Sequence, residues 1–105
     1  MWPKISINYS PNFNVIKRPK KNIKFIIIHY TGMRNELSAL NRLCNKEAKV
    51  SAHYFIKKNG LVFNLVPPLY EAWHAGESCW KDLKSLNRNS VGIEIQNSGH
   101  DNKYE

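Results

Sequence analysis

The stretch FIIIHYTG, residues 25–32, decides the fold of this chain. Four apolar residues, three of them consecutive β-branched isoleucines, lead directly into a histidine and a glycine turn. Such a run predicts a strand buried on both faces, in the middle of a sheet packed between helices. Because side chains alternate along a strand, Phe25, Ile27 and His29 share one face, and the imidazole is expected where the sheet meets a loop. For a lone histidine, a hydrogen-bonded structural role is the alternative.

Length and composition bound the kind of protein. The chain has 105 residues, of which 42% are hydrophobic, so a single domain with a modest core is expected. No apolar run of roughly 18 residues is present, and residues 1–8 lack the apolar core of a secretory signal, so we expect no membrane segment and a cytoplasmic location. Cys44 and Cys79 form no close-spaced pair, which favours buried apolar roles over a disulfide framework.

The net charge of +8 is concentrated near the N-terminus. Residues 1–24 carry six basic residues and no acidic residue, whereas ten basic and eight acidic residues follow from Phe25 onward. The basicity therefore belongs to an N-terminal arm, chiefly residues 17–21, and such a segment is typical of a solvated surface. Because aromatic residues do not interleave with this cluster, we expect no nucleic-acid partner, although a nucleic-acid binder working through the arm remains a rival hypothesis.

The remaining elements are predicted from local patterns. Residues 1–22 indicate an extended arm with at most one edge strand. Asn35 is placed to cap a helix that runs to about Asn45. Asn59-Gly60, between two apolar alternating segments, predicts a hairpin with a two-residue type I′ turn. The helix is expected to bury a stripe at helical spacing, formed by Leu37, Leu40, Leu43 and Cys44.

Glu94 stands out in the last alternating segment, residues 90–97. It lies between Ile93 and Ile95, whose β-branched side chains place the strand inside the sheet. A buried ionised carboxylate without a partner is costly, so such a residue is paired, bound to metal or held at a raised pKa. The equal alternative is a glutamate on the exposed face of an antiparallel strand.

Four short motifs carry a family resemblance when they are taken together. They are His29-Tyr30-Thr31, Val50-Ser51-Ala52-His53-Tyr54, Ala72-Trp73-His74-Ala75-Gly76 and Ser90-Val91-Gly92-Ile93-Glu94. In order and spacing, with the hairpin between them, they resemble the zinc-dependent N-acetylmuramoyl-L-alanine amidases of the AmpD/AmiD type over residues 25–97. These are relatives of the amidase-type phage lysozymes and the peptidoglycan recognition proteins.

The resemblance implies an α/β fold, a mixed central β-sheet flanked by helices in a single domain, with zinc in a groove above the sheet. It implies that His29 is the first zinc ligand and that Glu94 is the catalytic carboxylate. His53, Trp73 and His74 match residues that line the substrate cleft. The implied reaction is hydrolysis of the amide between N-acetylmuramic acid and L-alanine in peptidoglycan or a muropeptide.

The sequence departs from the family in its last part. The other two zinc ligands of the family, a His and an Asp, come from a Gly-His-Ser-Asp...Asp-Pro-Gly region that follows another helix and is expected beyond residue 105. His100-Asp101 resembles part of it but follows Glu94 too closely to leave room for that helix. We therefore expect residues 23–105 to be the N-terminal two-thirds of an amidase domain, inactive alone, with one sheet face left uncovered. A non-catalytic muropeptide-binding module is the alternative.

Overall fold

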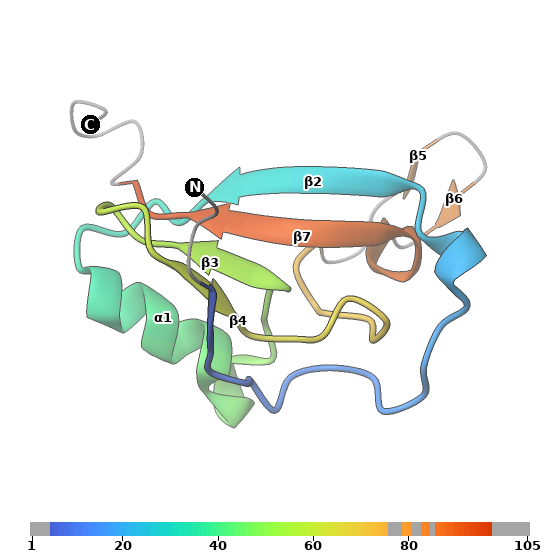
Figure 1. Cartoon of the computed structure of the whole chain (residues 1–105), viewed down its shortest axis with the longest axis horizontal. Helices are drawn as coiled ribbons and strands as arrows, with labels where there is room; N and C mark the ends of the chain where they lie inside the picture. Colours follow the sequence, from blue (N-terminus) through green and yellow to red (C-terminus); the bar gives the residue numbers. More distant parts are fainter. Residues whose placement is uncertain (1–4, 76–78, 81–82, 85, 98–105) are drawn as a thin grey trace.

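The computed structural model describes residues 5–75, 79–80, 83–84 and 86–97, and shows a mixed sheet with a helix against one side (Figure 1). Its five strands follow the order β1-β4-β3-β7-β2. The β3–β4 pair is antiparallel, whereas β1–β4, β3–β7 and β7–β2 are parallel. The predicted α/β fold with a mixed central sheet is thus confirmed. No helix in this part of the chain is long and apolar enough to cross a membrane.

The main elements have the following bounds. The sheet strands are β1 (Ile5–Ile7), β2 (Phe25–Tyr30), β3 (Tyr54–Ile56), β4 (Val62–Asn64) and β7 (Ser90–Ile95). A second, two-stranded sheet pairs β5 (Cys79–Trp80) with β6 (Leu83–Lys84). The helices are α1 (Glu36–Cys44) and the short 3₁₀ turns η1 (Lys20–Asn22), η2 (Lys46–Ala48) and η3 (Leu86–Asn89).

Strand β2 is an edge strand, and the prediction that both of its faces are buried is wrong. It pairs with β7 alone among the described strands. Phe25, Ile27 and His29 are half-buried on one face, whereas Ile26 and Ile28 on the other are 69% and 64% exposed. An apolar run indicates that its residues prefer to be buried. It does not indicate whether another element of the chain covers them. The expected uncovered apolar face is present on this side of the sheet.

Helix α1 covers the opposite face, the one that carries His29. Ala39 and Leu43 of the helix pack with Phe55 of β3 and Leu65 in the core. The predicted cap is confirmed, because the Asn35 side chain accepts a hydrogen bond of 2.8 Å from the Ser38 backbone N–H. The predicted stripe holds for Leu40, Leu43 and Cys44, which pack in or against the core. It fails for Leu37, which is 65% exposed, whereas Ala39, which the stripe did not include, lies in the core.

The β3–β4 hairpin has a three-residue loop in place of the predicted type I′ turn. The Gly60 N–H donates to the Lys57 carbonyl at 2.9 Å, and the Lys57 N–H donates to the Leu61 carbonyl at 2.9 Å. Gly60 has φ +89°, whereas Asn59 does not have positive φ, as a type I′ turn would require. Instead, Asn59 Oδ1 accepts from the Leu61 N–H at 3.0 Å, which stabilises the alternative loop.

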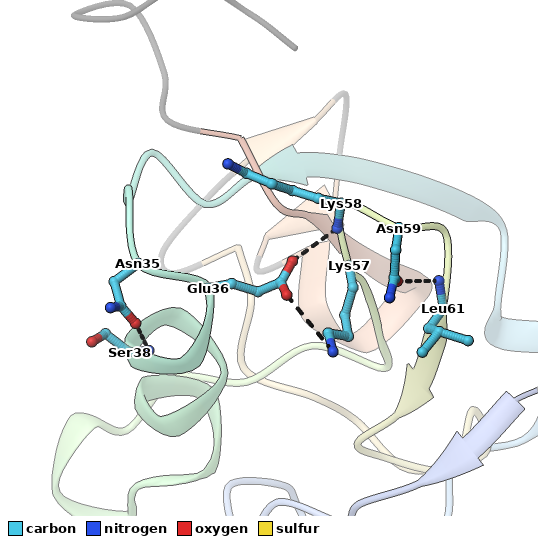
Figure 2. A network of polar contacts seen from close by, with 7 residues as sticks. All are labelled: Asn35, Glu36, Ser38, Lys57, Lys58, Asn59 and Leu61. Atoms are coloured by element: carbon cyan, nitrogen blue, oxygen red, sulfur yellow. Dashed lines mark hydrogen bonds and ion pairs between the residues drawn. The ribbon is translucent and has the colours of Figure 1, made fainter.

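The same loop fixes the start of α1 (Figure 2). Glu36 in the first turn of the helix accepts a hydrogen bond of 2.8 Å from the Lys58 backbone N–H. Its other carboxylate oxygen pairs with Lys57 Nζ at 3.8 Å. The helix N-terminus is therefore joined to the hairpin, which keeps α1 in place over the sheet face that carries the site.

The N-terminal arm is built into the domain. It supplies the expected single edge strand, β1, and then runs past the lower part of the view in Figure 1 to η1, beside the start of β2. Asn12, which is 1% exposed, donates to the carbonyls of Asn45 and Val50 at 2.8 Å each. Arg18 donates to the carbonyls of Pro68 and Asn87. Part of the basic segment is thus structural, and the expectation of a merely solvated cluster is wrong for Arg18.

Candidate functional site

His29 and Glu94 lie side by side on neighbouring strands. They are register partners in the parallel β2–β7 pair, so their side chains leave the same face of the sheet. The two residues that the resemblance assigns to one active site are therefore adjacent in the structure. Glu94 also pairs in register with Phe55 of β3, which packs in the core under α1. The site is therefore built on the edge strand β2 and its neighbour β7, on the sheet face that α1 covers.

Glu94 lies partly buried between the sheet and α1. A cavity of about 20 Å³ adjoins it, lined also by Thr31, Met33, Arg42 and the buried face of the helix. That volume is enough for one water molecule. Burial raises the pKa of the Glu94 carboxyl, and the nearby Arg42 opposes the shift. Because β7 is parallel to both neighbours and Glu94 is not exposed, the alternative of a solvent-facing antiparallel strand is excluded.

His74 reaches His29 from the loop that precedes β5. Its Nδ1 lies 3.1 Å from His29 Nε2, and its Nε2 lies 3.0 Å from Ser90 Oγ. The ring lies directly over Gly92, where an added Cβ would come within 2.4 Å of His74 Cγ. Glycine in the middle of β7 therefore makes room for the imidazole. Asn87 Oδ1 accepts hydrogen bonds from the backbone N–H groups of His74 and Ala75, which fixes this loop.

Burial favours the neutral form of all three described imidazoles. Burial lowers the pKa of His29. Burial, with further contributions from His29, His53 and Arg18, lowers the pKa of His74 to about 3. Burial and the charge of Arg18 lower the pKa of His53 to about 4, against an opposing hydrogen bond to the Tyr70 carbonyl. A neutral imidazole is the form that ligates metals and exchanges protons.

His53 and Trp73 differ in their burial. His53 has 0% exposure, its Nε2 donates to the Tyr70 carbonyl at 2.7 Å, and its Nδ1 accepts from the Gly92 N–H at 3.0 Å. The ring therefore lies in the interior and not along an open cleft. Trp73 is half-buried, and its indole N–H donates to Asn14 Oδ1 at 3.1 Å.

Three polar residues that sequence reasoning did not single out complete the site. Ser90 connects His74 to the Leu86 carbonyl, Asn87 holds the His74 loop, and Arg18 lies 3.3 Å from His53 Nε2. Asn87 belongs to a polar stretch with no periodicity, so no local signal in the sequence predicts its burial. In the structure it is only 7% exposed. Ser90 opens a motif of the family resemblance, which was a signal that could have drawn attention to it.

The described part of the chain offers one candidate metal ligand, His29. No group of three His, Cys, Asp or Glu side chains within it is placed to hold a metal ion. His29 offers a neutral imidazole whose Nδ1 has no hydrogen bond to any other described residue. His100 and Asp101 lie outside the described residues. One histidine ligand thus fits zinc, and a complete set of three is not present among the described residues.

Comparison with known proteins gives a consistent family. The family model for N-acetylmuramoyl-L-alanine amidase matches residues 19–105. The chain is 40% identical over 84 residues to the N-acetylmuramoyl-L-alanine amidase AmiD of Escherichia coli, an alignment that covers 73% of this chain and 29% of AmiD. It is 30% identical over 107 residues to the 1,6-anhydro-N-acetylmuramyl-L-alanine amidase AmpD of Haemophilus influenzae, covering 85% of this chain and 57% of AmpD.

Solved structures agree with the sequence matches. The crystal structure of AmpDh3 from Pseudomonas aeruginosa in complex with anhydromuramic pentapeptide superposes with a TM-score of 0.69 at 31% identity, covering 88% of this chain and 44% of that chain. Escherichia coli AmiD in complex with the substrate anhydro-N-acetylmuramic acid-L-Ala-D-gamma-Glu-L-Lys gives a TM-score of 0.65 at 38% identity, covering 82% and 34%. The chain therefore spans between 29% and 57% of the length of these four relatives.

Proposed function

The chain belongs to the N-acetylmuramoyl-L-alanine amidase family, and from this premise we propose that it takes part in hydrolysis of the amide between N-acetylmuramic acid and L-alanine. The observation that supports the proposal is the register pairing of His29 with Glu94 on one sheet face. A neutral imidazole and a carboxyl of raised pKa are the groups that a zinc hydrolase needs side by side.

The proposed substrate is a muropeptide. Two relatives of similar fold are described in complex with anhydromuramic peptides. Trp73, half-buried in the loop that also carries His74, offers an aromatic face to sugar or peptide. His53 is proposed to support the site from the interior, because it fixes Gly92 beneath His74 through two hydrogen bonds. The His53 ring accepts from the Gly92 N–H, and the His53 backbone N–H donates to the Gly92 carbonyl.

The proposed cofactor is zinc, with His29 as one ligand and the remaining ligands outside the described residues. When bound, zinc would lower the pKa of a coordinated water and polarise the scissile carbonyl. Glu94 accepts a proton from the attacking water and returns it to the leaving amine. Burial supports this role, because a carboxylate whose pKa is raised is a better proton acceptor than a solvated one.

A non-catalytic muropeptide-binding module is the second candidate. It is favoured by one observation, the lack of a three-ligand metal cluster in the described part of the chain. In this case the same face would bind a muropeptide and leave its amide bond intact. The nucleic-acid hypothesis loses support, because Arg18 of the basic segment is committed to internal hydrogen bonds.

One experiment separates these proposals. The chain is incubated with zinc and an anhydromuramyl tripeptide, peptide release is followed by chromatography, and ligand binding is followed by backbone NMR shifts around His29 and Glu94. Zinc-dependent release that disappears in Glu94→Gln supports the amidase. Because release by this chain is expected to be slow, it is followed over long incubations with excess zinc, and binding without any release then supports the binding module. If there is neither binding nor release, both proposals are wrong.

A further inference from the structure

The hydrogen bonds around His74 determine where the ring protons lie. Ser90 Oγ is 2.7 Å from the Leu86 carbonyl, which only accepts, so the hydroxyl proton of Ser90 is directed there. Toward His74 Nε2, at 3.0 Å, the same oxygen must then accept. His74 therefore carries its ring proton on Nε2. With its single ring proton on Nε2, His74 presents a lone pair at Nδ1.

That lone pair faces His29. The atom of His29 that lies 3.1 Å from His74 Nδ1 is Nε2. Two lone pairs at this distance would repel, so the favourable arrangement has the proton on His29 Nε2, donated to His74. In a neutral imidazole the other nitrogen, Nδ1, is then unprotonated. The chain of contacts thus runs from a backbone carbonyl through Ser90 and His74 and sets the tautomer of His29.

The surroundings hold His74 in the position that this requires. Gly92 lets the ring lie against β7, since a methyl group there would collide with three ring atoms. His53 fixes Gly92 in turn, because its backbone N–H donates to the Gly92 carbonyl and its ring accepts from the Gly92 N–H. Asn87 holds the backbone of the His74 loop. The His74 ring is therefore held from below by its packing on Gly92, and its backbone is held by Asn87.

We propose that Ser90 and His74 form a relay that keeps the ring proton of His29 on Nε2, so that Nδ1 is the atom of His29 that ligates the metal. His74 is a positioning residue in this arrangement. The relay also removes His74 from the set of ligands, because both of its ring nitrogens are already engaged. The inference rests on the proposed role of His29 as a metal ligand, and partners of this kind generally fix the orientation and tautomer of a ligating histidine.

The test reads ring tautomers directly. Long-range ¹H–¹⁵N spectra of the ¹⁵N-labelled chain without metal should show His29 and His74 both protonated on Nε2 at pH 7. Ser90→Ala removes the acceptor for the His74 Nε2 proton, so a His74 signal with the proton on Nδ1, and a matching change at His29, are expected. Ser90→Thr, which keeps the hydroxyl, should restore the original pattern. His29 protonated on Nδ1 in the unchanged chain would overturn the relay.

Metal addition then separates the relay from the proposed function. With Zn²⁺ or ¹¹³Cd²⁺, the metal should perturb or couple to Nδ1 of His29. His74→Gln keeps an amide N–H for Ser90 but no acceptor for His29, and should weaken metal binding by roughly 10- to 100-fold. His74→Asn, whose Oδ1 takes the place of Nδ1, should bind close to the unchanged chain.

Each metal result has one meaning. Correct tautomers with no metal effect at His29 would leave the relay standing and contradict His29 as a ligand. Metal at Nε2 would contradict the relay and leave the ligand role intact. Equal metal binding by the Gln and Asn variants of His74 would also contradict the relay, provided that both variants keep the dispersed amide spectrum of a folded chain.

Discussion

His29 Nε2 lies 3.1 Å from His74 Nδ1, a contact that joins the end of β2 to a loop 45 residues further along the chain. The contact depends on Gly92, since any side chain there would occupy the volume of the His74 ring. It also gives one polar partner to a half-buried imidazole that would otherwise lose hydrogen bonds to water. The same geometry that stabilises the fold thus determines which nitrogen of His29 is available for chemistry.

Glu94→Gln is expected to reduce muropeptide hydrolysis by about 10²–10⁴-fold, because the amide fills the same space but cannot accept a proton from water. Zinc binding and muropeptide binding should change little. The measurement is the rate of peptide release at saturating substrate. Glu36→Gln is the matched control, since Glu36 contacts the hairpin loop and not the site (Figure 2). Unreduced release by Glu94→Gln would mean that another residue is the base.

Acid is expected to destabilise the fold through His53. Its folded-state pKa is about 4, below the ordinary value of 6.5, so the unfolded chain binds a proton that the folded chain does not. The free energy of unfolding therefore keeps its full contribution from the neutral His53 ring above pH 6.5, and loses it as the pH falls toward about 4. Between pH 7 and pH 5 the loss should be about 2 kcal/mol for one such histidine.

The measurement is urea unfolding at several pH values. His53→Gln cannot titrate, so its free energy of unfolding should fall less steeply over the same range, even though it starts lower at pH 7. His74 shifts in the same direction and remains in the variant, so part of the dependence should persist. An unchanged slope in His53→Gln would show that this ring does not resist protonation in the folded chain.

Gly92→Ala is expected to cost about 1–3 kcal/mol of unfolding free energy, the usual range for overpacking. The added methyl would lie 2.4 Å from Cγ of His74, at the rigid base of the ring, so the ring must move away from His29. The ring signals of both histidines should therefore change. Gly60→Ala is the control: Gly60 has φ +89° and open space around it, so backbone strain should destabilise the fold without altering those signals.

The sequence predicts those features that depend on local chemistry. The cap at Asn35 and the unusual burial of Glu94 each follow from a few neighbouring residues, and both are found. The exposed outer face of β2 and the interior position of His53 were not predicted, because each depends on which distant elements pack nearby. The hairpin type was missed because the Asn59 side chain stabilises a competing loop. Four motifs placed in order indicated the family, but no motif revealed the contact between Ser90 and His74.

Zinc binding by residues 1–105 alone is expected to be weak and to fall short of one equivalent when protein and zinc are equimolar. A catalytic zinc site uses three protein ligands, and a single imidazole does not hold the ion tightly. Among the described histidines, His53 uses both ring nitrogens in internal hydrogen bonds, and those of His74 face Ser90 and His29. That leaves His29 as the single described histidine with a ring nitrogen available to a metal. Muropeptide release should be correspondingly slow.

Isothermal titration calorimetry with Zn²⁺ gives the stoichiometry, and peptide release measured in the same samples gives the activity. His29→Ala should abolish the weak binding that remains, because among the described histidines it removes the one with a ring nitrogen that is not hydrogen-bonded to another described residue. His100→Ala and Asp101→Ala serve as comparison variants for two groups outside the described residues. If the unchanged chain binds one zinc tightly and either of these variants loses it, the ligand set includes that residue and the single-ligand prediction is wrong. If tight binding survives both variants but is lost in His74→Asn as well as in His74→Gln, His74 is itself a ligand, and the hydrogen bond between His29 and His74 gives way to the metal.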